Sequence, residues 1–537
     1  MIPIVDIFAG AGGLSEGFAR AGFKVALSCE KDEIFCETLK IRHFVNSFKK
    51  TNIPDDYYNF LKGKISLEDL KTKFPEKFEN SDNSVICHTM GRKSNNLLHE
   101  KINQNIGVHK NFILLGGPPC QAYSIAGRSR SLGVGLNGKN KEELAKSFYK
   151  DERHLLYLEY LEVLAFHKPT IFIMENVKGL MSAKTDHNSD KGNVFDNILN
   201  GLREPSQIMN DLNIFKDNNQ KKITKVSYNI FSLKDNPDFL FKIKDKEINH
   251  KEFVIDSSNY GVPQKRERLF IIGIRDDLPC KNSFLLKSEM NTVRDVIENL
   301  PKLRSGLSKA KDNNKNWLNE VKNKFEEAFS DNFNEFKFLK KNINKLEKSI
   351  NQLGRGSNFV KDKIITNGNS KLLEFLTDKH IDGWIQHQSR SHLTEDIIRY
   401  FYCSSLSQIY GYSPKIDKWR GNLEKLMPKH KNIKLKNGRL STKVHADRFK
   451  TQVWDKPSST ITSHISKDGH YFIHPDPCQA RSLTVREAAR LQTFPDNYFF
   501  YGNKTEQYIQ VGNAVPPYLS FQIANKIKNF LIKNKDN

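Results

Sequence analysis

The sequence has few cysteines, seven in 537 residues. None belongs to a Cys-x-x-Cys pair or to a His/Cys spacing typical of zinc ligands, and so long a chain does not need a disulfide framework. We therefore expect no metal site and a reducing compartment. No apolar run is long enough to span a bilayer, and strand-like residues begin at Ile2 without a signal peptide. The sequence predicts a cytoplasmic protein with no membrane contact.

Acidic residues are fewer than basic ones: the chain has 62 Asp and Glu and 85 Lys and Arg, which gives a formal charge of +23. A surplus of this size attracts polyanions and favours nucleic acid as a partner. A Lys-rich composition inherited from an AT-biased genome would produce the same surplus, so charge alone does not decide. With 38% hydrophobic and 27% charged residues, the chain has the composition of a folded globular protein.

The first half of the chain alternates short apolar runs with helical patterns. Such alternation predicts an α/β fold with a largely parallel sheet covered by helices, in which ligands bind at the carboxyl ends of the strands. The expected strands are Ile2–Phe8, Val25–Glu30, Asn111–Leu115, Thr170–Glu175 and Glu267–Arg275.

The amino-acid composition changes from about residue 285 to 381, where Lys, Asn, Glu and Phe are frequent. Four apolar residues at helical spacing predict a mostly helical insertion, and we expect them to form its core: Trp317, Val321, Phe325 and Phe329. Further on, residues 400–412 are rich in aromatics, and residues 428–448 are strongly basic, as in exposed loops that face nucleic acid.

A Gly-rich turn follows the first expected strand. It contains Gly10, Gly12 and Gly13, and glycines in such a turn let the backbone approach a ligand closely. The next strand ends at Glu30, where a carboxylate can accept hydrogen bonds from both ribose hydroxyls of an adenosine. Ser15 replaces the third glycine of a dinucleotide fingerprint, so a phosphate-free adenosine cofactor is favoured over a dinucleotide. From this segment alone, a purely structural turn is an equal alternative.

Cys120 stands in a stiff loop after a strand, in the run GGPPCQ. A free thiol has a pKa of about 8.5, so a reactive cysteine needs nearby positive charge or backbone donors. The flanking prolines and glycines present this side chain rather than pack it, and we interpret Cys120 as a nucleophile. A further strand ends in the acid Glu175, and Arg266 and Arg268 begin the last expected strand.

Six segments in this order resemble the C5-cytosine methyltransferase family: DIFAGAGGL, GGPPCQAYS, FIMENVKGL, QKRERLFIIGIR, RSLTVREAARLQTFPD and QVGNAVPP. The resemblance covers residues 1 to about 275 and about 445 to 530. It implies a Rossmann-like, S-adenosylmethionine-dependent methyltransferase sheet and a second, smaller target-recognition domain. We accordingly divide the chain into a catalytic domain (1–280), a target-recognition domain (281–480) and a segment that returns to the catalytic domain (481–537).

The same resemblance assigns roles to individual residues. Cys120 is the nucleophile, Glu175 contacts the base, and Arg266 and Arg268 serve the catalytic pocket. The residues that match the S-adenosylmethionine site are Phe8, Gly10, Gly12, Gly13, Leu14, Glu30, Pro119, Asn513 and Val515. The family often carries an Asp that contacts the adenine amino group before the PPC loop, and no clear counterpart is found here. His88 is the residue we place in that region.

The implied chemistry explains the need for these groups. Cytosine C5 is a poor nucleophile, so a thiolate must first add to C6, and an acid at N3 must relieve the charge that then builds up. A cytosine inside a duplex is out of reach, so it must be extruded at a cost of a few kcal/mol, which DNA contacts must offset. Arg266 and Arg268 point to one face of a strand and would orient the base, although a structural ion pair is an equal alternative for one of them.

The C-terminal region has its own signals. Thr484 and Glu487 form a predicted capping box before a framework helix, and a closing helix over residues 516–531 is expected beside the first strand. The alternatives to a DNA methyltransferase are a tRNA cytosine methyltransferase, an inactive binding module and a small-molecule methyltransferase. The long basic insertion favours double-stranded DNA. We expect a monomeric modification enzyme of a restriction-modification system, with a cognate endonuclease encoded nearby.

Overall fold

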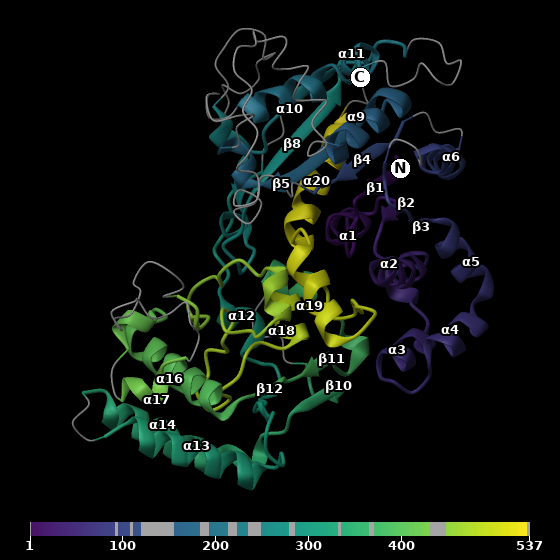
Figure 1. Cartoon of the computed structure of the whole chain (residues 1–537). Coiled ribbons are helices and arrows are strands. Elements are labelled where there is room, and N and C mark those ends of the chain that lie inside the picture. Colours follow the sequence, from purple (N-terminus) through teal and green to yellow (C-terminus); the bar gives the residue numbers. More distant parts are fainter. Residues whose placement is uncertain are drawn as a thin grey trace.

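The protein is described from a computed structural model. Figure 1 shows an upper part built on one large sheet and a lower part that contains α13, α14 and α16. The structure describes residues 2–91, 95–107, 111–119, 155–182, 193–212, 223–234, 249–278, 285–330, 334–364, 370–419, 422–428 and 447–533.

The large sheet has eight strands in the order β3-β2-β1-β4-β5-β8-β6, with β7 paired to β8. The strands are β1 (Ile4–Ile7), β2 (Val25–Glu30), β3 (Val85–Cys87), β4 (Ile113–Gly116), β5 (Ile171–Val177), β6 (Tyr228–Phe231), β7 (Val254–Asp256) and β8 (Glu267–Arg275). The five strands from β3 to β5 run parallel, and β8 runs antiparallel to β5, β6 and β7. This arrangement is the Rossmann-like methyltransferase sheet that the sequence predicts.

The direction of β8 has a consequence for the site. Arg268 pairs with Val177 in the register of β5 and β8, so the amino end of β8 lies at the carboxyl edge of β5. The carboxyl ends of parallel strands are where ligands bind in such sheets. The antiparallel strand therefore delivers its first residues to the same edge as the parallel strands.

Helices cover both faces of the sheet. Alternate residues of a strand point to opposite faces. Val5 and Ile7 of β1 pack in one core with α6 (Asn95–Ile106) and α9 (Leu155–His167), whereas Ile4 packs in another with α1 (Gly13–Arg20) and α20 (Pro517–Lys533). Buried on both sides, the strands consist of nearly continuous apolar residues, as expected for a parallel sheet.

The helix α20 packs on α1. A Cβ added to Gly17 would lie 2.5 Å from the carbonyl oxygen of Pro517 and would also collide with the backbone nitrogen of Phe521. Ser520 donates a hydrogen bond to the carbonyl oxygen of Leu14. The expected closing helix is therefore present, and its direct contact is with α1 beside the first strand.

The lower part has a helical core. The helices α13 (Asn314–Ala328), α14 (Phe336–Ser349), α16 (Thr394–Tyr410) and α17 (Leu423–Leu426) pack together, and the predicted stripe of Trp317, Val321, Phe325 and Phe329 is buried among them. Two small sheets accompany the helices, β10 (Gly356–Lys361) with β11 (Gly383–Gln388) and β9 (Gly306–Leu307) with β12 (Ser391–His392). The insertion is mostly helical, as predicted, but the sequence reading missed these strands.

A framework joins the two parts. The helix α18 (Val485–Leu491) contacts α12 (Val293–Ile297), α19 (Lys504–Asn513) and β11, and Thr484 and Glu487 form the predicted capping box at its start. The remaining α-helices are α2 (Glu33–Asn46), α3 (Asp55–Leu61), α4 (Leu67–Lys73), α5 (Pro75–Asn83), α10 (Asn193–Arg203), α11 (Pro205–Asp211) and α15 (Lys371–Leu376).

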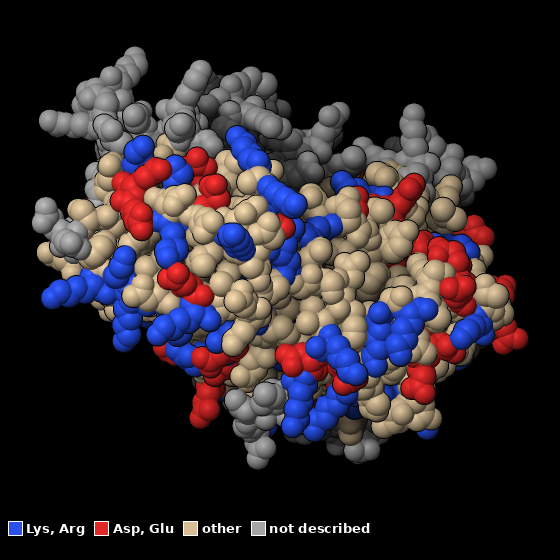
Figure 2. Space-filling model, turned by 90° about the horizontal axis from the view of Figure 1, so that it is seen from below, with Lys and Arg blue, Asp and Glu red and all other residues tan. Residues whose placement is uncertain are grey.

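The surface is charged on the face seen from below. Figure 2 shows that Lys and Arg side chains on this face are interspersed with Asp and Glu. Among the residues that the structure describes, no helix combines the length and apolar character needed to cross a bilayer. Within the same residues, no group of three or more His, Cys, Asp and Glu side chains is arranged to hold a metal ion.

Candidate active site

The Gly-rich turn after β1 has a backbone that most side chains disfavour. Gly10 and Gly12 have φ of +56° and +74°, and Phe8 between strand and turn also has a positive φ of +57°. Positive φ costs little only for glycine, so the two glycines are required by the path of the chain. The N–H of Gly10 donates to Oε2 of Glu30 at 2.9 Å. The first two predicted cofactor segments are therefore in direct contact.

The C-terminal segment completes this turn. A Cβ on Gly13 would collide with the carbonyl oxygen of Val515, so only glycine permits the close approach of the two backbones. Tyr498 donates its hydroxyl to the carbonyl oxygen of Ala11 at 2.5 Å. Asn513 is the last residue of α19, two positions before Val515. The structure thus brings Gly13 and Val515 together, while Leu14 is buried in the core beneath them.

Asp6 is a buried acid under the turn that the sequence reading did not assign. Burial raises its pKa to about 7, the negative charge of Glu30 adds to the rise, and hydrogen bonds from Ser15 oppose it. Among the described residues, its Oδ2 has no hydrogen-bond partner although the atom is buried. An orphaned acceptor of this kind is costly unless it is protonated or meets a ligand.

His88 lies beside the expected adenosine site. It follows β3, and its N–H donates to the carbonyl oxygen of Glu30 at 2.8 Å. The backbone of His88 is thus fixed next to the carboxylate that would bind the ribose. Its role toward adenine stays a prediction.

Glu175 is the central acid of the other half of the site. Its Oε1 lies 3.2 Å from Nε of Arg268, and both side chains are largely buried, with 16% and 19% exposed. Burial raises the pKa of Glu175, while Arg268 and, to a smaller extent, Arg266 lower it. Because burial has the larger effect, the pKa of Glu175 lies above its usual value, and this carboxyl stays protonated at higher pH than a solvent-exposed glutamate does.

The loop before Cys120 is held against this acid. A Cβ on Gly117 would lie 3.2 Å from Oε2 of Glu175, and Asn176 donates through Nδ2 to the carbonyl oxygen of Pro118 at 3.1 Å. Pro119 is exposed at the end of this segment. Cys120 itself lies outside the described residues. The chain therefore passes Glu175 three residues before the predicted nucleophile.

Arg266 is buried behind the site. Its Nη1 donates to the carbonyl oxygen of Ile461 at 2.8 Å and, more weakly, to that of Gly512 at 3.4 Å. Burial, followed by the neighbouring charge of Arg268, lowers its pKa to about 9. Arg266 therefore ties three segments together, whereas Arg268 is the arginine that pairs with Glu175.

Gln264 is a second residue that the sequence reading passed over. It is fully buried, and its Oε1 accepts from the N–H of Ile461 at 2.8 Å while its Nε2 donates to the carbonyl oxygen of Leu491 at 3.3 Å. The sequence signal that could have pointed to Gln264 is its place at the start of the motif Gln264–Arg268. A polar side chain that is buried at such a place must find hydrogen-bond partners in the protein.

A cleft of about 1890 Å³ lies next to Arg268, between β5, β8 and the segment over residues 448–472. Its lining contains more basic side chains than acidic ones, and the acidic ones are Asp256, Glu267 and Asp468. The basic residues are Lys178, Lys251, Lys265, Arg268, Arg448, Lys450 and Lys467. A cleft with this balance of charge concentrates polyanions near the acid and arginine pair.

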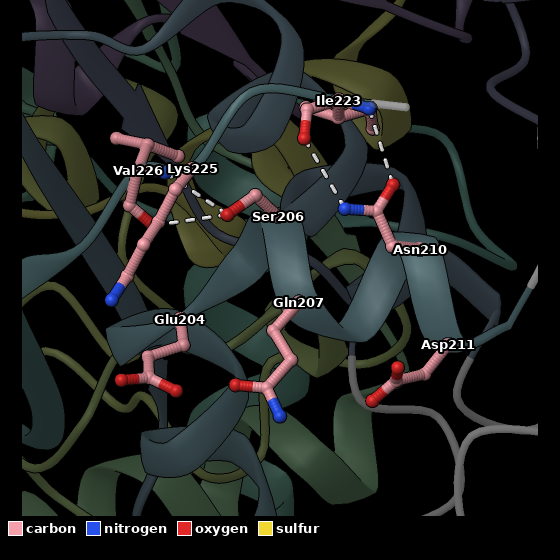
Figure 3. Close-up of a pocket in the computed structure, with 8 residues that line it drawn as sticks. All are labelled: Glu204, Ser206, Gln207, Asn210, Asp211, Ile223, Lys225 and Val226. Atoms are coloured by element: carbon pink, nitrogen blue, oxygen red, sulfur yellow. Dashed lines mark hydrogen bonds between the residues drawn. The ribbon is translucent and has the colours of Figure 1, made fainter. Parts of the chain in front are cut away.

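A smaller pocket of about 620 Å³ lies on α11, and Figure 3 shows the residues around it. Ser206 exchanges hydrogen bonds with the backbone of Val226, and Asn210 does the same with Ile223. These side chains fix α11 to the segment before β6. None of the predicted site residues lines this pocket.

The comparison with protein families decides between the enzyme classes. The model of C-5 cytosine-specific DNA methylases matches residues 2–75, 64–205 and 246–529. The chain belongs to this family. It is a DNA cytosine-5 methyltransferase that uses S-adenosylmethionine, as the motifs predicted, and the tRNA alternative is not favoured.

Curated relatives of this methylase span nearly its whole length. It is 29% identical to the type II methyltransferase M.Bpa9945I of Bacillus paralicheniformis over 98% of this chain and 99% of the relative. It is 23% identical to M.DdeI of Desulfomicrobium norvegicum over 98% and 88%, and 24% identical to M1.HphI of Haemophilus parahaemolyticus over 98% and 86%. All three relatives are described as type II methyltransferases.

The residues around the glycine turn fit an adenosine-bearing methyl donor. The turn has no side chains at Gly10, Gly12 and Gly13 that would block a ligand, and the carboxylate of Glu30 ends β2 beside it. The chemistry of this donor set suits the hydroxyls of a ribose, and the turn offers no Lys or Arg for a phosphate. The site is consistent with S-adenosylmethionine and unlike a dinucleotide site.

Proposed function

We propose that this methylase adds the Cys120 thiolate to C6 of an extruded cytosine in a specific duplex sequence. The bond from sulfur to C6 forms as the C5–C6 double bond opens, so C5 becomes the nucleophile that takes the methyl group. Loss of the C5 proton and departure of the thiolate then restore the ring. The observation that carries the proposal is the contact of the loop before Cys120 with Glu175.

In this scheme Glu175 protonates or hydrogen-bonds N3 of the base. The raised pKa of Glu175 supports the role, because only the protonated carboxyl can donate. Arg268, 3.2 Å away, orients the carboxyl and limits the rise of its pKa. Arg266 would keep β8 and the C-terminal segment in register, through its bonds to the carbonyls of Ile461 and Gly512.

S-adenosylmethionine supplies the methyl group. We propose that Phe8, Gly10, Gly12, Gly13, Leu14, Glu30, Pro119, Asn513 and Val515 form its site. Glu30 would bind the ribose hydroxyls, and the backbone of the glycine turn would line the donor. Asp6, whose Oδ2 is an orphan among the described residues, would fix the turn from below.

The basic cleft is the proposed seat of duplex DNA. Lys178 and Lys265 on the sheet side line the same cleft as Lys450 and Lys467 of the middle domain, so phosphate contacts there would offset the cost of extruding the base. We propose that residues 1–280 form the catalytic domain, residues 281–480 the target-recognition domain that reads the sequence, and residues 481–537 the segment that returns to the catalytic domain. We propose a monomeric, cytoplasmic enzyme.

The proposed biological setting is a restriction-modification system, on the strength of the type II relatives. Methylation would then protect host DNA from a cognate endonuclease encoded nearby. The test is deletion of the gene together with its neighbours, followed by phage plating and digestion of the host DNA. Unchanged phage sensitivity and the absence of a nuclease gene would contradict this setting without touching the catalytic proposal.

The catalytic proposal is tested with a duplex that carries 5-fluorocytosine at the target. The fluorine cannot leave as a proton does, so the adduct should accumulate as a covalent complex when S-adenosylmethionine is present. We expect Cys120→Ser to form no complex and to leave no methylation in bisulfite sequencing. Cys87→Ser, which changes an exposed cysteine at the end of β3, is the matched control and should behave like the wild type. A complex formed by Cys120→Ser would reject the assignment.

A further inference from the structure

A cluster of three half-buried cations lies on the turn between β11 and β12. Arg355 and Lys504 both donate to the carbonyl oxygen of Ser389, at 3.4 Å and 3.3 Å, so their charged groups are separated by less than the sum of these distances. Arg390, the next residue of the turn, stacks its guanidinium 3.8 Å above the ring of Tyr508. Three segments far apart in the sequence thus place like charges at one point.

The cluster has little negative charge to balance it. Asp312 pairs with Arg355 at 3.1 Å, but the same carboxylate also pairs with Arg304 at 2.6 Å. Within the described chain, neither Arg390 nor Lys504 has an ion pair with a carboxylate. Glu506, the acid nearest to Lys504 in sequence, is taken up by the N–H of Asn503 in the capping box of α19. The positive charge is therefore left for a partner outside the chain.

The electrostatics of Lys504 agree with this geometry. Burial, followed by the charges of Arg355 and Arg390, lowers its pKa to about 8. A lysine crowded by cations and partly withdrawn from water gains from an anion more than a fully solvated lysine does. Carbonyl oxygens satisfy some of its N–H groups but carry no full charge.

The position of the cluster identifies the anion. Arg390 donates to the carbonyl oxygen of Lys467 at 3.5 Å, and Lys467 lines the basic cleft. The cations therefore continue the wall of the cleft beyond the residues that enclose it. The polyanion that this methylase handles is DNA, and a guanidinium with an ammonium beside it suits a phosphate.

We propose that Arg355, Arg390 and Lys504 bind a backbone phosphate of the DNA at the rim of the cleft. The proposal rests on the cleft as the seat of the duplex. A phosphate contact carries no base sequence, so the site would anchor and orient the duplex equally on its recognition sequence and elsewhere. It would act on affinity and not on the chemical step.

The test measures duplex binding by fluorescence anisotropy over a range of KCl concentrations. One phosphate contact contributes about 0.9 to the slope of log affinity against log salt. We expect Lys504→Gln and Arg390→Gln to weaken binding several-fold at low salt and to make the slope shallower by about one, for the recognition sequence and an unrelated duplex alike. The methylation rate at saturating DNA should stay at the wild-type level.

Charge-conserving and remote variants separate an anion site from a structural contact. Lys504→Arg should retain the wild-type slope, and Lys64→Gln, an exposed lysine outside the cleft, should retain it too. A lower unfolding temperature of Lys504→Gln with an unchanged slope would overturn the proposal in favour of a structural role. Lys265→Gln tests the cleft itself: if its slope changes and that of Lys504→Gln does not, only the rim site fails, and if neither changes, the cleft is not the seat of the DNA.

Discussion

Nε of Arg268 lies 3.2 Å from Oε1 of Glu175, across the pair of strands β5 and β8. The two residues are 93 positions apart, and only the antiparallel direction of β8 lets them meet. An acid that is driven toward its protonated form by burial is thereby held next to a permanent cation. The charge of Arg268 therefore limits how far burial raises the pKa of Glu175.

Replacing Glu175 by Gln should lower the methylation rate at saturating substrates by about 100- to 10,000-fold, the usual share of a general acid. Gln can donate a hydrogen bond to N3 but cannot transfer a proton. The measurement is single-turnover methylation with a radiolabelled donor. Glu204→Gln, in the separate pocket on α11, serves as the control and should keep full activity. A loss of less than threefold would exclude Glu175 as the acid.

The methylation rate should fall at alkaline pH, because Glu175 loses its proton as the pH rises through its raised pKa. Arg268 lowers that pKa, so Arg268→Ala should raise it and move the falling limb to higher pH, together with a slower rate. Arg268→Lys keeps a charge and should move the limb less. A limb that stays in place in Arg268→Ala would show that the two groups are not coupled.

Asp6 should make the free protein less stable as pH rises. Its pKa is about 7 in the folded state and near 3.8 when exposed, so between these values the folded form holds a proton that the unfolded form lacks. The free energy of unfolding then decreases by up to about 1.4 kcal/mol per pH unit, and this contribution is fully lost above pH 7. Asp6→Asn should flatten the profile in urea unfolding between pH 5 and 8, whereas the exposed Asp55→Asn should not.

Gly17→Ala should destabilise the protein by about 1 to 3 kcal/mol, the range for overpacking a tight contact. Ala is the better helix former, so the sign would be opposite if only propensity mattered. The new methyl group would meet backbone atoms of α20, which cannot turn aside. Urea unfolding measures the change, and Gly91→Ala, whose Cβ meets nothing within 4 Å, is the control.

The strands show what a sequence can predict. The bounds of β2 and β8 agree with the expected ranges, since each is a mostly apolar run that ends in a charged residue. The strands β3, β6 and β7 have only three or four residues and, unlike the equally short β1 and β4, do not precede a glycine-rich motif. The direction of β8 was also not foreseen, because it is set by partners across the sheet and not by its own residues.

The site divides in the same way. The glycine turn, Glu30 and Val515 were predicted from motifs and do meet in the structure. Asp6 was overlooked although it stands in the first motif, because an acid inside a strand gives no sign of its burial. The proximity of Arg390 to Lys504 could not be predicted, since 114 residues separate them and neither stands in a motif.

The contact between α1 and α20 also bears on how the enzyme is made. The first α-helix of the chain is sealed by residues that leave the ribosome about 500 positions later, and Val515 closes the glycine turn from the same end. During synthesis the glycine turn therefore stays uncovered on one side until α20 docks on α1. A chain released before α20 would lack the contacts that close this turn.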